Sequence, residues 1–332
     1  MTTENLNFEK ALKFENESDY ITILKRDKHT RLEGLCTEYL FIDEIIKNKF
    51  ENFSSGYWFS LKNNLFNITK VLTNIDDFKE LDYKILNFFL KNNVSTWVVY
   101  FNESLKLFEY IKYTNEIQNN IDFSKGLSYP KSKKIPFLPK ITERNIARQE
   151  QAIEFLANRN ALKKVALERA FANFWLGSGS FWDIDCFTFY KEKLIAFEVK
   201  QKYPTAKGTF GLNTGVANLF GFLSSLKIEV IHIILTKPIN DEQIHAIDFY
   251  TKNEYIAKSN WIATKFSNEI LSNNTSTAPN KTSIFGNYQL KYYHIQPNKF
   301  HFLKKLYSEP NLLIEFIDSK THNINSLFDL NS

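Results

Sequence analysis

Cysteine, glycine and proline are all scarce in this chain of 332 residues. The two cysteines, Cys36 and Cys186, form no Cys-x-x-Cys pair, which excludes both a disulfide framework and a zinc ribbon. Ten glycines and eight prolines are too few for a collagen-like or low-complexity chain. This cysteine usage is consistent with a protein of a reducing compartment.

Long apolar runs are lacking as well. The longest, such as residues 230–235, are far shorter than the ~20 residues that cross a bilayer. The first 14 residues carry charges and no apolar centre, so we expect no signal peptide. We therefore expect a cytoplasmic protein with no membrane partner.

Several common catalytic motifs are missing. The chain has no GxxxxGK[ST], no GxSxG and no HExxH, which excludes a P-loop motor, a nucleophile elbow and a zincin site. His232 lies within an apolar run, and we interpret it as a core histidine rather than a ligand.

The positive charge is concentrated in one segment. The formal net charge is +5, and residues 124–150 hold seven lysines and arginines against two glutamates, which accounts for the whole excess. Clustered cations favour nucleic acid because they release counterions from phosphates. A solvated linker is the alternative interpretation of this segment.

The apolar content of 43%, with 31 phenylalanines, predicts thick cores, and the length suits about two domains. Pro130, Pro136 and Pro139 forbid a continuous helix, so residues 124–142 are predicted to be a basic linker. Before it, residues 1–123 form a mixed α/β domain for recognition, dimerisation or partner binding. In that domain we expect a helix at 36–50 and a hairpin at 97–111 that turns at Asn102 and Glu103.

After the linker the pattern changes several times. Thr142 caps a predicted helix that extends to about residue 176 and that Asn160 interrupts, and glycines at 177 and 179 end it. Two strands at 181–190 and 194–200, a polar loop at 201–212, a helix from Asn213 to residue 226 and a core strand at 228–235 follow. Residues 240–260 look helical and 284–303 look like a strand or hairpin. We assign 143–260 to one domain and 261–332 to a strand-rich extension.

The two strands carry the chemistry. Asp185 lies in the first strand, and Glu198 and Lys200 lie two residues apart, hence on one side, of the second. Carboxylate oxygens suit hard divalent cations such as Mg²⁺. A lysine beside them can orient a metal-bound water for attack on a phosphodiester.

At these residues the sequence resembles the PD-(D/E)XK nuclease superfamily, over about residues 162–235. The helix segment ALERAFANFWLG, the first arm FWDIDCFTFY and the second arm LIAFEVK follow the order of the family pattern, although no proline precedes the aspartate. The resemblance implies a restriction-endonuclease-like core, a mixed central sheet flanked by helices. It implies Asp185 and Glu198 as metal ligands and Lys200 as the catalytic lysine.

Two further acidic residues enter through the same resemblance. Glu168 is the helix-borne acid that would bind metal directly or through water. Asp183 lies on the same strand face as Asp185 and is the alternative ligand; Asp185 is preferred because apolar residues flank it. Gln201 occupies a position where some members place a polar active-site residue.

The resemblance therefore implies a Mg²⁺-dependent endodeoxyribonuclease, able to use Mn²⁺, of a prokaryotic restriction or phage-defence system. Its partners would be DNA, a second copy of the chain for cutting both strands, and proteins of the defence system. Two alternatives stay open: a nuclease for branched DNA or for RNA, and an inert binding protein with a nuclease-like fold.

Overall fold

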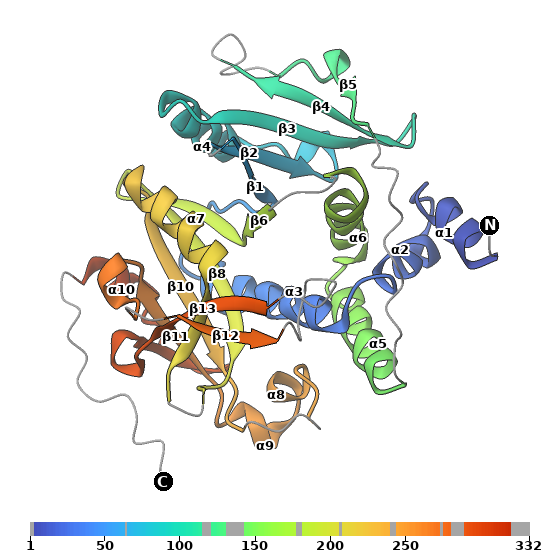
Figure 1. Cartoon of the computed structure of the whole chain (residues 1–332). Coiled ribbons are helices and arrows are strands. Elements are labelled where there is room, and N and C mark those ends of the chain that lie inside the picture. Colours follow the sequence, from blue (N-terminus) through green and yellow to red (C-terminus); the bar gives the residue numbers. More distant parts are fainter. Residues whose placement is uncertain are drawn as a thin grey trace. The chain divides into compact units, whose positions relative to one another are not determined.

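The computed structural model describes residues 3–63, 65–114, 121–130, 143–176, 181–205, 208–239, 244–272, 275–279 and 289–319 (Figure 1). These residues form an α/β structure with two mixed sheets and one antiparallel sheet, which confirms the predicted class. Two compact units interleave along the chain. Unit 1 is Met1–Leu32 with Ser54–Ile184, and unit 2 is Glu33–Phe53 with Asp185–Ser332. Compactness does not test independent folding, so the predicted domain boundaries at residues 123, 142 and 260 stay a prediction.

Unit 1 contains a sheet in the order β5-β4-β3-β2-β1-β6. Its strands are β1 (Tyr57–Lys62), β2 (Leu65–Leu72), β3 (Ser95–Asn102), β4 (Leu107–Tyr113), β5 (Leu127–Ser128) and β6 (Phe181–Ile184). Strands β2 and β3 are parallel, and helix α4 (Glu80–Lys91) connects them. The predicted hairpin is confirmed: β3 and β4 pair, and Asn102 Oδ1 accepts the backbone N–H groups of Ser104 and Leu105 at the turn.

The remaining helices of unit 1 come from both of its chain segments. They are α1 (Thr3–Ala11), α2 (Glu17–Leu24), α5 (Glu143–Ala157), α6 (Leu162–Ala170) and the π-helical turn Phe171–Trp175. The predicted interruption is confirmed, because Asn160 has a φ of 55° between α5 and α6. This left-handed conformation ends a helix, and asparagine tolerates it better than most residues. Thr142, residues 177–180 and residues 131–142 of the predicted linker lie outside the described residues.

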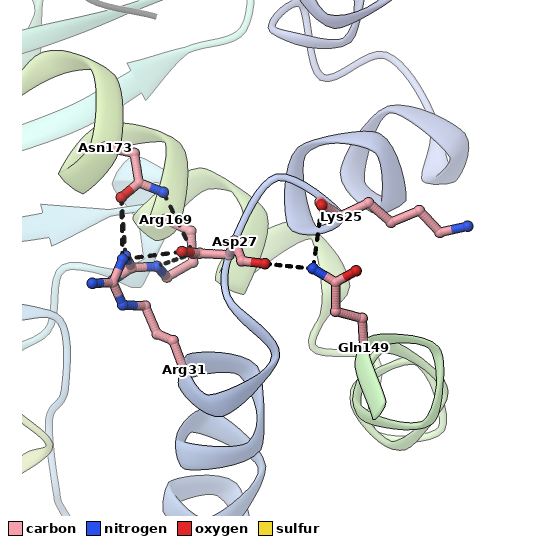
Figure 2. A network of polar contacts seen from close by, with 6 residues as sticks. All are labelled: Lys25, Asp27, Arg31, Gln149, Arg169 and Asn173. Atoms are coloured by element: carbon pink, nitrogen blue, oxygen red, sulfur yellow. Dashed lines mark hydrogen bonds and ion pairs between the residues drawn. The ribbon is translucent and has the colours of Figure 1, made fainter. Parts of the chain in front are cut away.

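A buried charge network ties these helices together (Figure 2). Asp27, which follows α2, accepts from Arg169 Nε on α6 at 2.6 Å and from Arg31 Nη1 at 3.0 Å. Asn173 lies between the two guanidinium groups and accepts from both. Gln149 on α5 donates to the Asp27 backbone carbonyl at 2.5 Å. The network therefore connects the chain around Asp27 with α5 and α6, whose contacting residues lie 122 and 142 positions further along the sequence.

Unit 2 is built on a five-stranded sheet in the order β14-β11-β10-β8-β7. Its strands are β7 (Cys186–Tyr190), β8 (Lys193–Lys202), β10 (Glu229–Thr236), β11 (Asn260–Lys265) and β14 (His301–Lys305). Strand β8 is buried over six consecutive residues because both faces of the sheet are covered. The rings of Phe41 and Phe197 lie 5.7 Å apart on one face, and those of Phe220 and His232 lie 6.0 Å apart on the other.

The expected strand at 181–190 is wrong in one respect. It divides at Asp185: β6 pairs with β1 in unit 1, whereas β7 pairs with β8 in unit 2. Asp183 and Asp185 therefore belong to different units. Alternation of apolar residues predicts extended chain, but it does not say which strand each half will pair with.

Helix α7 (Thr214–Ser225) joins β8 to β10 and makes them parallel neighbours, as in a βαβ crossover (Figure 1). Asn213 caps it by accepting the Gly215 N–H at 2.7 Å. The predicted core strand at 228–235 is β10. The polar loop expected at 201–212 is partly wrong: β8 extends to Lys202, and β9 (Phe210–Asn213) forms an antiparallel sheet with β13 (Gln289–Ile295) and β12 (Ser276–Pro279).

The rest of unit 2 is made of short elements and the larger part of α3 (His29–Phe41). The short elements include the π-helical turn Ile42–Ile46, α8 (Asp248–Thr251), α9 (Asn253–Ile256) and α10 (Leu313–Asp318). The helix predicted at 36–50 is confirmed in part: α3 begins earlier, at His29, and ends at Phe41, and the π-helical turn continues it only to Ile46. The region 240–260 holds two short helices, and residues 240–243 lie outside the described part. So do residues 284–288 of the strand or hairpin expected at 284–303; the described remainder holds strands β13 and β14, which pair with other strands.

Candidate active site

The β7–β8 hairpin places Asp185 beside Glu198. Cys186 pairs with Phe197, so the preceding Asp185 lies opposite Glu198, and opposite residues of an antiparallel pair share a face. Asp185 Oδ2 accepts the Val199 backbone N–H at 2.6 Å. Both residues are buried, with 7% of Asp185 and 2% of Glu198 exposed. Two buried carboxyl side chains therefore lie at neighbouring positions of the hairpin.

Lys200 supplies the counter-charge. Its Nζ lies 2.6 Å from Glu198 Oε1, and 37% of its side chain is exposed against 3% for Glu198. The amine reaches the buried carboxylate from the solvent side. The structure therefore brings Asp185, Glu198 and Lys200 together, with the acids inside and the lysine at the opening.

His232 lies next in the row across the sheet. It is in register with Glu198, and its Nδ1 lies 3.1 Å from the Glu198 backbone carbonyl oxygen. A carbonyl only accepts, so Nδ1 carries the proton. Burial, helped by the positive charges of Lys202 and Lys200, holds the pKa of His232 well below its usual range. The ring is thus neutral, as a core histidine is expected to be.

Lys202 is the basic residue that the sequence argument missed. Its Nζ donates to the Gly211 carbonyl on β9. Burial and the neighbouring charge of Lys200 lower the pKa of Lys202 to about 8, although Glu198 opposes the shift. The signal was present in the sequence, since Lys202 continues the alternation of Glu198 and Lys200 along one strand face.

Gln201 lies between these lysines and has another contact. Its Nε2 donates to the Ala246 carbonyl oxygen at 2.9 Å. Successive side chains of a strand point to opposite faces, so Gln201 lies on the other face of β8 from Lys200. The structure therefore shows Gln201 holding the chain that precedes α8.

Glu168 and Asp183 form a separate acidic pair in unit 1. Burial raises the pKa of Glu168, and the negative charge of Asp183 raises it further. The positive charges of Lys164 and Lys70 oppose this shift. Lys164 Nζ lies 4.0 Å from Glu168 Oε1 and donates to Ser55 Oγ at 2.8 Å. The four predicted acids thus divide into Glu168 and Asp183 in one unit and Asp185 and Glu198 in the other.

The donor set of unit 2 suits a hard divalent cation. Within the described residues, no group of three or more histidine, cysteine, aspartate or glutamate side chains is arranged to hold a metal. Mg²⁺ does not need such a cage, because it commonly keeps several waters and is bound by one or two carboxylates together with substrate phosphate oxygens. Asp185 and Glu198 are two carboxylates of this kind, next to each other on the hairpin.

Comparison with known families, curated proteins and solved structures finds no match to this chain. In the part of the chain that the structure describes, every helix is too short or too polar to traverse a lipid bilayer.

Proposed function

We propose that the chain is a Mg²⁺-dependent endodeoxyribonuclease with a restriction-endonuclease-like core in unit 2, acting in prokaryotic restriction or phage defence. The observation that carries this proposal is the row of Asp185, Glu198 and Lys200 on one face of the β7–β8 hairpin. The helix α7 between parallel β8 and β10 agrees with the order of elements in the PD-(D/E)XK pattern.

Each residue of the row has a distinct task in phosphodiester hydrolysis. When bound, Mg²⁺ would act as a Lewis acid toward the phosphate and would help to generate the nucleophile from water. Asp185 and Glu198 would hold it, and the Val199 N–H fixes the orientation of the Asp185 carboxylate. Lys200, released from its ion pair with Glu198, positions the attacking water and stabilises the negative charge that develops on the phosphate.

Plasmid cleavage with Mg²⁺ tests this proposal. We expect Asp185→Asn, Glu198→Gln and Lys200→Met each to slow cleavage by about 100-fold or more, the usual effect of removing one electrostatic stabiliser. Lys193→Met is the matched control, because Lys193 is an exposed residue of the same strand on the opposite face. Thermal unfolding of each variant separates loss of chemistry from loss of folding.

The cleavage products assign the substrate. Discrete fragments indicate a sequence-specific endonuclease, and unpatterned nicking indicates a non-specific one. Preferential cutting of branched DNA or of RNA would change the proposed substrate but leave the proposed catalytic residues the same. No cutting with Mg²⁺ or Mn²⁺, together with no Mn²⁺ binding by calorimetry, would overturn the enzymatic proposal in favour of an inert binding fold.

The role of Glu168 as a metal ligand is proposed from the sequence pattern alone. Glu168→Gln should slow cleavage if that role holds, whereas Asp183→Asn should leave the rate near that of the wild type, because Asp185 is the preferred ligand. Equal rates for wild type and Glu168→Gln would remove Glu168 from the mechanism.

A further inference from the structure

One strand face carries a charged residue at every second position from 198 to 202. Glu198, Lys200 and Lys202 follow one another on β8, and alternate residues of a strand repeat every ~6.6 Å on one face. Lys200 Nζ lies 2.6 Å from Glu198 Oε1, and Lys202 is the next residue along the same face of the strand. A second ammonium group, that of Lys202, therefore follows Lys200 on the strand face that carries the proposed catalytic residues.

The surroundings of Lys202 leave it capacity for a ligand. Its contact with the Gly211 carbonyl accounts for one of the three N–H donors of an ammonium group. With a pKa of about 8, the amine is mostly protonated at pH 7. The positive charge is nevertheless disfavoured there by burial and by Lys200, so an anion that contacts both lysines relieves an existing electrostatic cost.

We propose that Lys202 binds the backbone phosphate next to the scissile one, so that a nucleic-acid strand lies along the C-terminal end of β8, where residues 200–202 are partly exposed. This inference rests on the proposed function for the position of the scissile phosphate. A polyanion is the ligand that fits, because its charges repeat along a line as the two lysines do, whereas a single small phosphate would contact only one end of the row. Lys202 is thus a binding residue, distinct from the catalytic Lys200.

Salt-dependent binding measures the number of phosphate contacts. The assay uses a labelled DNA duplex and a labelled single strand, the Asp185→Asn background in EDTA to prevent cleavage, and fluorescence anisotropy over a range of NaCl concentrations. The slope of log K against log salt is negative, and each lost phosphate contact reduces its magnitude by about 0.9 for a duplex and about 0.7 for a single strand. We expect that decrease for Lys202→Gln and an unchanged slope for Lys202→Arg.

The control is Lys193→Gln, which removes an exposed lysine from the other face of β8. A merely structural role of the Lys202–Gly211 contact would change stability but leave the salt slope as it is, and thermal melting of each variant records that change. An unchanged slope for Lys202→Gln, or an equal decrease for Lys193→Gln, would overturn the inference. So would a background protein that binds neither duplex nor single strand.

The assay also separates this inference from the proposed function. Binding with the expected slope change, but no cleavage by the wild type, would support a nucleic-acid strand along β8 and reject the nuclease. Cleavage with an unchanged slope would support the nuclease and reject the role of Lys202.

Discussion

Gly56 occupies a backbone conformation in which a side chain would be strained. Its φ is 79°, and a Cβ at this position would lie 2.8 Å from the Val71 carbonyl oxygen. The chain just before it cannot easily relax, because the buried Lys70 amine donates to Ser54 Oγ and to the Ser55 carbonyl. A single residue therefore determines how the chain enters β1.

We expect Gly56→Ala to lower the free energy of unfolding by about 1–3 kcal/mol, the usual cost of a strained backbone position. Urea unfolding followed by circular dichroism measures the change. Gly34→Ala is the opposite control: Gly34 is in helix α3, and apart from its chain neighbours and the backbone of its own helix no atom lies within 4 Å of its Cβ position, so alanine should stabilise by about 0.5–1 kcal/mol. If Gly56→Ala and Gly34→Ala changed the free energy of unfolding equally, this account of Gly56 would be contradicted.

At the scale of elements, the Asp27 network joins the chain that follows α2 to helices α5 and α6 of unit 1 (Figure 2). Burial disfavours the Asp27 carboxylate, but the charges of Arg169 and Arg31 and the hydrogen bonds to Arg169 and Asn173 outweigh it and hold the pKa of Asp27 below its usual value. Removing one partner of such a buried pair leaves an uncompensated charge.

We therefore expect Asp27→Asn to lower the free energy of unfolding by about 3 kcal/mol at pH 7. The ionised carboxylate stabilises the folded state above the unfolded pKa of about 3.9. That contribution disappears as the pH falls through the lower folded pKa, so the difference between wild type and variant should shrink there. Urea unfolding at pH 7 and in steps below pH 4 measures both values.

The control is Lys25→Met, which removes an exposed ion pair with Glu150 at 3.7 Å and should change stability by less than about 0.5 kcal/mol. An Asp27→Asn variant as stable as Lys25→Met would show that the network contributes little net stability.

At the scale of the whole molecule, a ligand that binds only the folded state raises its stability. Mg²⁺ at 100 times its dissociation constant would add about 2.7 kcal/mol to the free energy of unfolding. We expect Mg²⁺ to raise the melting temperature of the full chain by several degrees and to have no such effect on Asp185→Asn or Glu198→Gln. Differential scanning calorimetry with Mg²⁺ and with EDTA measures the shift.

Glu192→Gln is the matched control, since Glu192 is an exposed carboxylate in the turn between β7 and β8. It should keep the full Mg²⁺ response. A response that is the same in wild type, Asp185→Asn and Glu198→Gln would place the cation elsewhere and remove the basis of the proposed mechanism.

Much of unit 2 could be predicted from the sequence because its signals are local. The apolar run of β8, the asparagine cap of α7 and the buried strand β10 each depend on residues close together in the chain. The neighbouring positions of Asp185 and Glu198 depend on one hairpin, and the register of a hairpin is set by its short turn. The left-handed Asn160 at the end of α5 is a signal of the same local kind.

Tertiary structure decided what depends on distant partners. Sequence alternation made residues 181–190 extended, but only the competing partners β1 and β8 divided them at Asp185 between two sheets. The Asp27–Arg169 pair joins residues 142 positions apart, and no local pattern encodes such a contact. Propensity and alternation act over a few residues, whereas strand pairing and buried charge pairing are settled by the free energy of the complete fold, which is why the sequence determined the row on β8 and the structure determined its surroundings.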